Sequence, residues 1–246
     1  MAAEARREDI LVASLELFAR QGRHGVTTKA IAEAAGVSEA LLYRHFPSKE
    51  HLFSEVQKHC LEGTQQTARL LASAPPSTEL LVLEIYFMCR EILGFSLEST
   101  EPERATKAHI QRLCLASLAE DGEFVRGFLA ANMTVWVPVI AASLAAAERA
   151  GDLSTRPPKP ELVIWFSHHA VTMLAKTHLP AVPVVDYGVP EPELLAECVR
   201  FALRGVGLSA AAIDRTFNPA ALEREIAALT ARASQGDTSD RPRSTP

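Results

Sequence analysis

The chain has 246 residues, of which 48% are hydrophobic, 6% aromatic and 22% charged. This length accommodates one large domain or two small ones, and the apolar content supports a sizeable core. Alanine and leucine dominate, and runs of alternating β-branched residues are nearly absent. Such a composition excludes a fold built on strands and predicts an all-α protein.

The net charge of −5 argues at first against a nucleic-acid partner. Residues 1–58, however, carry eight Lys or Arg and eight Asp or Glu, so the acidic excess lies in the rest of the chain. A neutral small domain can bind DNA through a few well-placed cations. The charge balance therefore neither excludes DNA binding nor supports it.

The four cysteines lie in apolar helical patterns without C-x-x-C spacing, which is typical of thiols that act as small hydrophobic groups. We therefore expect a reducing, cytoplasmic location, and the N-terminus lacks the apolar stretch of a signal peptide. Residues 127–147 form an uncharged run of 21 residues, long enough to cross a membrane. Because this run is rich in Ala and continues an amphipathic pattern on both sides, we predict a buried central helix and no membrane partner.

The first predicted helix spans Arg6–Arg20, and two short helices joined by a tight turn follow within residues 27–46. Thr27 or Thr28 caps the first short helix and Ser38 caps the second. Gly36 ends the first, because glycine adopts a left-handed conformation without steric cost. Apolar positions on these helices are Ile10, Leu11, Leu15, Leu17, Phe18, Ile31, Ala32, Ala35, Leu41, Leu42 and Phe46. The pattern indicates a helix-turn-helix, whose second helix can enter the DNA major groove.

The exposed face of the second short helix is expected to carry groups that hydrogen-bond to phosphates or base edges. These residues are Ser38, Glu39, Tyr43, Arg44 and His45. Lys49 follows in the first turn of the next helix, where a cation opposes the helix dipole. It is therefore expected to meet an external anion, the alternative being a solvated surface lysine.

The motif G-V-T-T-K-x-I-A-x-x-A-G-V-S-x-x-x-L-Y-x-H-F-x-x-K-E-x-L resembles the N-terminal signature of the TetR/AcrR family of bacterial transcriptional regulators, over residues 7–56. The resemblance implies phosphate contacts for Thr28, Tyr43 and Lys49. It also implies positions at or near base edges for Lys29, Glu39, Ala40, Arg44 and His45. Glu39 departs from a simple DNA-binding pattern, because a carboxylate accepts a hydrogen bond from cytosine but is repelled by phosphate.

Helical periodicity and breaks predict the remaining organisation. We expect a DNA-binding domain over residues 1–50, a ligand-binding and dimerisation domain over 51–233, and a disordered tail over 234–246. The predicted helices are Ser48–Leu71, Thr78–Leu97, a helix that starts from a capping box at Thr100–Glu103, Phe124–Ala150 with a bend at Pro138, Glu161–His178, Glu193–Val206 and one from Asn218 to Ala233. A long loop is expected over Pro180–Pro192.

Two functions are assigned to the second domain. An apolar cavity with one or two hydrogen-bonding groups would take a small hydrophobic or aromatic effector, and the same residues could instead simply pack the core. Its candidate lining is Phe87, His109, Met133, Trp136, Trp165 and His169. The resemblance implies a four-helix dimer interface formed by the last two large helices, with candidate residues Phe166, Leu194, Cys198 and Phe201.

The sequence contains no P-loop, no G-x-S-x-G and no G-x-G-x-x-G. Adjacent His168 and His169 point about 100° apart on a helix and have no third ligand, so no metal site and no cofactor are predicted. The sequence therefore predicts a homodimeric, ligand-responsive repressor that binds a palindromic DNA operator and is not an enzyme. The alternative is an α-helical small-molecule-binding protein or enzyme with a vestigial helix-turn-helix.

Overall fold

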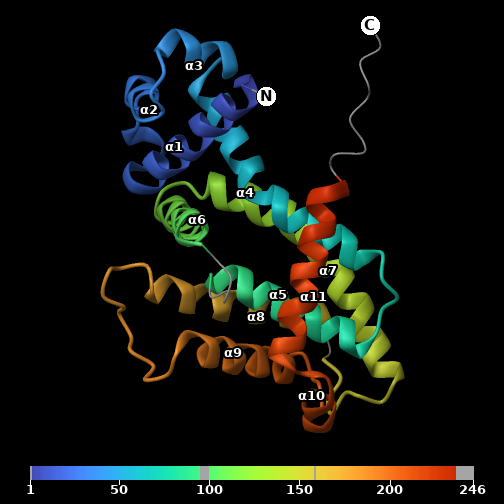
Figure 1. Cartoon of the computed structure of the whole chain (residues 1–246). Coiled ribbons are helices and arrows are strands. Elements are labelled where there is room, and N and C mark those ends of the chain that lie inside the picture. The colour runs from blue at the N-terminus through green and yellow to red at the C-terminus, as the bar shows by residue number, and fades with distance from the viewer. Residues whose placement is uncertain (1, 95–99, 158, 237–246) are drawn as a thin grey trace, which may run out of the picture. The chain divides into compact units, whose positions relative to one another are not determined.

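A computed structural model describes residues 2–94, 100–157 and 159–236, and these residues form eleven α-helices (Figure 1). The helices are α1 Ala2–Gly25, α2 Thr28–Ala34, α3 Glu39–His45, α4 Lys49–Ala72, α5 Thr78–Leu93, α6 Glu101–Ala119, α7 Glu123–Arg149, α8 Pro160–Thr177, α9 Glu191–Gly205, α10 Ala210–Thr216 and α11 Pro219–Gly236. Within the described residues the β structure is limited to an isolated bridge between Leu153 and Leu208. The prediction of an all-α fold is confirmed.

The helices divide into two compact units. The first comprises Met1–Glu62, Glu98–Asn132 and Ala175–Val185, and the second comprises Gly63–Leu97, Met133–Leu174 and Asp186–Pro246. Helix α6 and the beginning of α7 therefore belong to the same unit as the helix-turn-helix.

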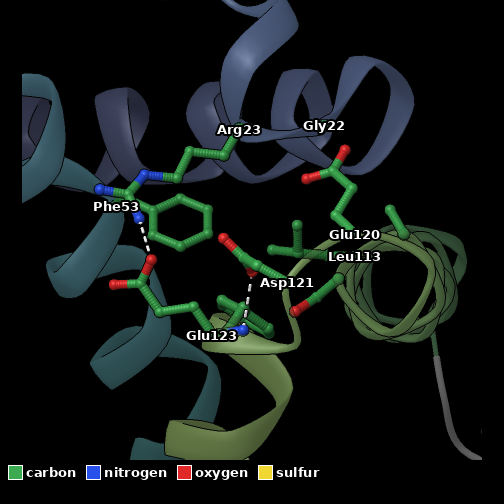
Figure 2. Close-up of a pocket in the computed structure, with 10 residues that line it drawn as sticks. Gly22, Arg23, Phe53, Leu113, Glu120, Asp121 and Glu123 are labelled. Atoms are coloured by element: carbon green, nitrogen blue, oxygen red, sulfur yellow. Dashed lines mark hydrogen bonds and ion pairs between the residues drawn. The ribbon is translucent and has the colours of Figure 1, made fainter.

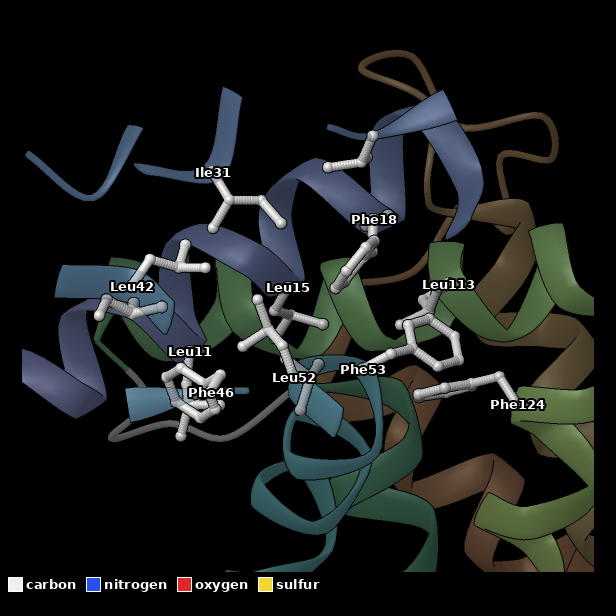
Figure 3. Close-up of a cluster of buried hydrophobic side chains, with 14 of the residues drawn as sticks. Leu11, Leu15, Phe18, Ile31, Leu42, Phe46, Leu52, Phe53, Leu113 and Phe124 are labelled. Carbon is white, nitrogen blue, oxygen red and sulfur yellow. The ribbon is translucent and has the colours of Figure 1, made fainter. Parts of the chain in front are cut away.

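In the core of the first unit, side chains of α1 pack with side chains of α2, α3, α4, α6 and the start of α7 (Figure 3). Its buried side chains are Ile10, Leu11, Leu15, Phe18, Ile31, Leu42, Phe46, Leu52, Phe53, Leu113 and Phe124, with smaller neighbours. Phe53 of α4 is the centre of an aromatic group, 5.0 Å from Phe18 and 5.4 Å from Phe124 between ring centroids. The edge-to-face geometry of these pairs adds to the stabilisation by apolar burial.

Helix α1 extends beyond the predicted Arg6–Arg20 and contains a break at Gly22, where φ is 69°. The break aims Arg23 at the hollow in Figure 2, which is lined by residues of α1, α4, α6 and α7. The guanidinium of Arg23 lies 5.0 Å from the Phe53 ring centroid and pairs with Glu123. A side chain at Gly22 would meet the carboxylate of Glu120, with a Cβ only 2.6 Å from Oε1. Arg23 thus links the end of α1 to α4 and to the first turn of α7.

Helix α5 forms the centre of the second unit. It is buried almost all round, as predicted, and packs against α9, α10 and α11. Glu223 of α11 holds that helix to α5, because it accepts hydrogen bonds from the Tyr86 hydroxyl at 2.8 Å and from Nε of Arg90 at 3.1 Å. Burial, and then this carboxylate, raise the pKa of Tyr86, so its hydroxyl remains a donor.

The structure corrects several predicted boundaries. Helix α10 was not predicted, and α9 begins at Glu191, so Pro192 lies in a first helical turn that needs no donor from it. Helix α11 continues to Gly236, so the first residues of the predicted disordered tail are helical. The end of the predicted Thr78–Leu97 helix and tail residues 237–246 lie outside the described residues.

Helix α7 also differs from its prediction as a buried central helix. Only 28% of its most apolar 18-residue segment is buried, and the mean hydropathy of that segment is 1.7. By length and composition alone the helix could cross a membrane, although core helices pass the same test. The buried residues form one stripe that includes Met133, Trp136, Ile140 and Leu144, while small residues occupy the exposed side.

Candidate nucleic-acid interface

Both helices of the helix-turn-helix are capped at their N-termini by side-chain hydrogen bonds at the predicted positions. The Thr27 hydroxyl accepts from the Ala30 amide at 3.1 Å, and the Ser38 hydroxyl accepts from the Leu41 amide at 3.2 Å. Thr27 is therefore the cap of α2. Gly36 has a φ of 64° in the turn, a conformation that costs glycine little. Thr27 thus fixes where α2 begins, Gly36 allows the turn after it, and Ser38 fixes where α3 begins.

The recognition helix α3 is held to the domain by its buried side and by Arg7. Leu42 and Phe46 are fully buried, and the Arg7 guanidinium lies 5.2 Å from the Phe46 ring centroid. Arg7 also pairs with Glu55 of α4. A helix this short is only marginally stable alone, so these contacts fix the direction in which its outer face points.

The residues predicted to meet DNA lie on the outer surface of α2 and α3. Lys29, Ser38, Glu39, Ala40, Tyr43 and Arg44 are exposed, whereas Thr28 and His45 are partly buried. Three of them form a hydrogen-bonded chain between the two helices. The Tyr43 hydroxyl donates to Thr28 Oγ1 at 3.3 Å, and Thr28 Oγ1 donates to Glu39 Oε1 at 2.9 Å.

Lys49 has a partner within the protein, and its contact with an external anion stays a prediction. Its Nζ donates to the backbone carbonyl of Val26 at 2.8 Å, so it ties the start of α4 to the residue before α2. An ammonium carries three donors, and a phosphate contact would use one of the other two. The sequence did not indicate this bond, because its partners are 23 residues apart.

Most of the candidate effector residues make aromatic contacts within the second unit. Phe87 of α5 and Trp136 of α7 are buried and stacked, with ring centroids 5.4 Å apart, and Met133 is also buried. On α8 the half-buried Trp165 stacks on exposed His169 at 5.3 Å and meets His168 edge to face at 5.9 Å. The five candidates among them, Phe87, Met133, Trp136, Trp165 and His169, belong to the second unit.

His109 belongs to the first unit, where its charged form is disfavoured. Partial burial lowers the pKa of this half-buried histidine. The contacts within each unit do not test whether His109 lines the same cavity as the other candidate effector residues, so this stays a prediction.

Glu84 of α5 is a feature that the sequence reading missed. It is fully buried, accepts a hydrogen bond from the Ser143 hydroxyl at 2.9 Å, and leaves Oε2 without a partner among the described residues. Burial raises the pKa of this carboxyl to about 8, opposed by the Ser143 hydrogen bond. The signal in the sequence was a single acid within the apolar run from Leu80 to Cys89.

The candidate dimer residues lie on α8 and α9 with unequal exposure. Phe166 is 64% exposed and Phe201 is 63% exposed, whereas Cys198 is partly buried and Leu194 nearly buried. Leu162 and Met173 are also exposed on α8. Their spacing from Phe166 places all three within about 40° around the helix, on one apolar face.

Other chemistry is sparse in the part of the chain that the structure describes. No group of three or more His, Cys, Asp or Glu side chains there could hold a metal ion. All four cysteines are free, and burial raises the pKa of Cys60 to about 12 and those of Cys114 and Cys198 to about 11. Their thiols remain protonated and weakly reactive at neutral pH.

Comparisons with known proteins agree with this geometry. Residues 10–56 match the family of bacterial regulatory proteins, tetR family. The HTH-type transcriptional regulator AcrR of Shigella flexneri is 33% identical over 123 residues, which cover 50% of this chain and 52% of that protein. The nucleoid occlusion factor SlmA of Photorhabdus laumondii is 33% identical over 105 residues, 42% of this chain and 51% of that protein. The chain thus matches about half the length of these curated relatives.

The likeness extends further among solved structures. The TetR family protein CprB from S. coelicolor A3(2) has a TM-score of 0.56 and 25% identity, covering 92% of this chain and 100% of that one. The fold and the exposed face of α3 define the class as an all-α protein with a DNA-binding helix-turn-helix. Within that class, residues 10–56 carry a DNA-binding domain of the tetR family, and the chain shares its fold with a protein of that family, CprB.

Proposed function

We propose that this protein is a homodimeric repressor that binds a palindromic operator and is released by a small hydrophobic or aromatic effector. The α2–α3 pair carries the DNA-binding part, because its buried side is fixed while Lys29, Tyr43 and Arg44 face outward. Cations and hydroxyl donors on one short helix pair supply both phosphate contacts and base contacts.

Homodimer formation is supported by the apolar side chains that α8 and α9 expose. Phe166, Met173 and Phe201 each expose more than half of their surface in the single chain. A self-complementary interface on this face would bury them in both copies. The two recognition helices would then read half-sites about 34–36 Å apart on one side of the duplex.

Response to an effector is supported by the aromatic stack of Phe87 and Trp136 in the second unit. A ligand that enters there shifts the protein only as far as it prefers one conformation over the other. In the repressor mechanism, the conformation that binds the effector holds the two recognition helices at a spacing that no longer fits successive grooves.

Selection of bound sequences from a random DNA pool tests the proposal directly. We expect enrichment of a palindrome whose half-sites are about one helical turn, or a multiple of it, apart. Small molecules are then screened for release of the selected DNA. A pool that yields no enriched sequence would contradict the repressor, and an enriched sequence without symmetry would contradict the dimeric reading.

A further inference from the structure

The carboxyl group of Glu84 is buried in the second unit and has no part in the DNA interface. Glu84 lies among Leu81, Ile85 and Cys89, and like them it has no exposed surface. One of its oxygens accepts from Ser143 Oγ, and Oε2 has no hydrogen-bond partner among the described residues. No Lys, Arg or His in the described part of the chain pairs with it. A buried carboxyl in this state is costly, so it is rarely present without a role.

Glu84 lies on the same seam between α5 and α7 as the aromatic stack. Phe87 follows Glu84 by three residues on α5, and Trp136 precedes Ser143 by seven residues on α7. Residues three or seven apart share a helix face, so the pairs Glu84–Ser143 and Phe87–Trp136 lie along one line of contact. The ring planes of the aromatic pair are 22° apart. The seam therefore carries a carboxyl oxygen and an aromatic stack on the same side of both helices.

Both groups favour the same kind of ligand. An ionised carboxylate requires a positive partner when it is buried, and the faces of Trp and Phe attract cations through their quadrupoles. Apolar residues around them, such as Met133 and Ile140, favour a ligand body without further charge. One positive group on an apolar body satisfies all three conditions.

Entry to the seam requires α7 to move away from α5, since Glu84 and Ser143 are both fully buried. Pro138 lies between Trp136 and Ser143 in α7, where it removes one backbone hydrogen bond and makes bending easier.

We propose that the effector is an organic cation, an amine on an aromatic or apolar body, and that Glu84 binds its positive charge. This proposal rests on the proposed function only in that the ligand is called an effector. Binding to the Glu84 seam is a property of the free protein and is measured without DNA.

The test is calorimetric titration of the full chain with three probes that share one body: naphthylmethylamine, naphthylmethanol and naphthoate. We expect the amine to bind at least tenfold more tightly than the alcohol, and naphthoate to bind most weakly. Glu84→Gln and Glu84→Met should abolish the preference for the amine. Glu79→Gln makes the same chemical change at an exposed position of α5 and should leave the preference intact.

Three results would overturn the proposal: an alcohol that binds as tightly as the amine, an amine preference that survives in Glu84→Gln, or no binding of any probe. Circular dichroism establishes that the variants are folded, and Glu84→Met gives an apolar replacement of similar length if Glu84→Gln unfolds. DNA affinity measured without probes separates the two ideas. Absence of DNA binding refutes the repressor, while loss of amine preference in the Glu84 variants still establishes the site.

Discussion

The Thr28 hydroxyl on α2 donates a hydrogen bond to the Glu39 carboxylate on α3 at 2.9 Å, which ties the two helices of the DNA-binding motif together. Tyr43 donates in turn to Thr28 at 3.3 Å, so the protons of both hydroxyl groups are used within the protein. Contact with phosphate requires at least one of them to turn outward. We therefore expect Glu39 to act on DNA affinity through its own charge and through the hydroxyl that it engages.

Replacement of Glu39 by Ala should strengthen binding to DNA of any sequence. The change removes a negative charge from the DNA-facing surface and frees the Thr28 hydroxyl to donate to a phosphate. If Glu39 also accepts from a cytosine, the same variant should lose preference at one base pair, by about 1–3 kcal/mol. Fluorescence anisotropy with random and selected duplexes measures both effects, and Glu33→Ala on the exposed side of α2 is the control. Weaker binding to random DNA would contradict this role.

Phosphate contacts and base contacts should separate in three further variants. Tyr43→Phe and Lys49→Ala should weaken all DNA sequences alike, and Lys49→Ala should reduce the salt dependence of log K by about one unit. Arg44→Ala should relax sequence preference at a cost of about 1–3 kcal/mol. Because Lys49 also bonds to Val26, its variant needs a thermal melt to show that the domain is folded. Unchanged affinity and specificity in all three would remove the proposed docking.

The DNA-binding motif could be predicted because its determinants are local. Thr27, Gly36 and Ser38 each act on amides or dihedral angles within a few residues of themselves. The bond from Lys49 to Val26 joins residues 23 positions apart, and no spacing rule in the sequence reports it. Long-range contacts of this kind depend on how helices pack, which periodicity alone leaves open.

In the second unit, more of the structure depends on long-range packing that the sequence pattern does not report. Helix α10 has seven residues, a Ser209 cap and two buried residues, too little periodicity to stand out in the sequence. Glu84 looks like a single polar interruption in an apolar helix, and only the position of Ser143 on α7 shows that it is buried and partly satisfied. The effector lining stays a prediction, since the contacts that the structure shows are the Phe87–Trp136 pair on α5 and α7 and the Trp165–His169 pair on α8.

Phe201→Glu should convert a dimer into a monomer without unfolding it. Phe201 is 63% exposed in the single chain, so the substitution costs the monomer little, whereas an unpaired carboxylate buried in an interface costs several kcal/mol. Operator affinity should fall in parallel, because one recognition helix engages only one half-site. Sedimentation velocity at micromolar concentration measures the assembly. Leu118→Glu, at a 57% exposed apolar position on α6, is the control and should remain dimeric. A monomeric wild-type protein would refute the dimer outright.

The two tryptophans allow the effector region to be followed directly. Trp136 is buried against Phe87, so a ligand that opens this stack should change its emission, and Trp136→Phe should weaken release of DNA by that ligand while DNA affinity is unchanged. Trp165→Phe leaves Trp136 as the reporter and assigns the signal. Normal release by Trp136→Phe, together with unperturbed emission of both indoles, would place the pocket elsewhere.

The last prediction concerns the pH dependence of stability that Glu84 imposes. Its pKa is about 8 in the folded chain against 4.5 for the unfolded reference, so the folded state holds the proton more tightly. Below the unfolded value both states are protonated, so the ionisation of Glu84 takes nothing from the stability of the folded state. As pH rises from 4.5 towards 8 the unfolded chain releases its proton first, and the free energy of unfolding decreases. Glu84→Gln removes this loss, because an amide has no proton to release.

Urea denaturation at pH 5 and pH 8 measures the effect. Each unit of pKa difference corresponds to about 1.4 kcal/mol, so the stability of Glu84→Gln relative to wild type should increase by at least that amount between the two pH values. Glu79→Gln, at an exposed position on the same helix, should follow the wild-type curve. Parallel curves for Glu84→Gln and wild type would mean that Glu84 ionises as easily in the folded chain as in the unfolded one, which its complete burial and its partnerless Oε2 argue against.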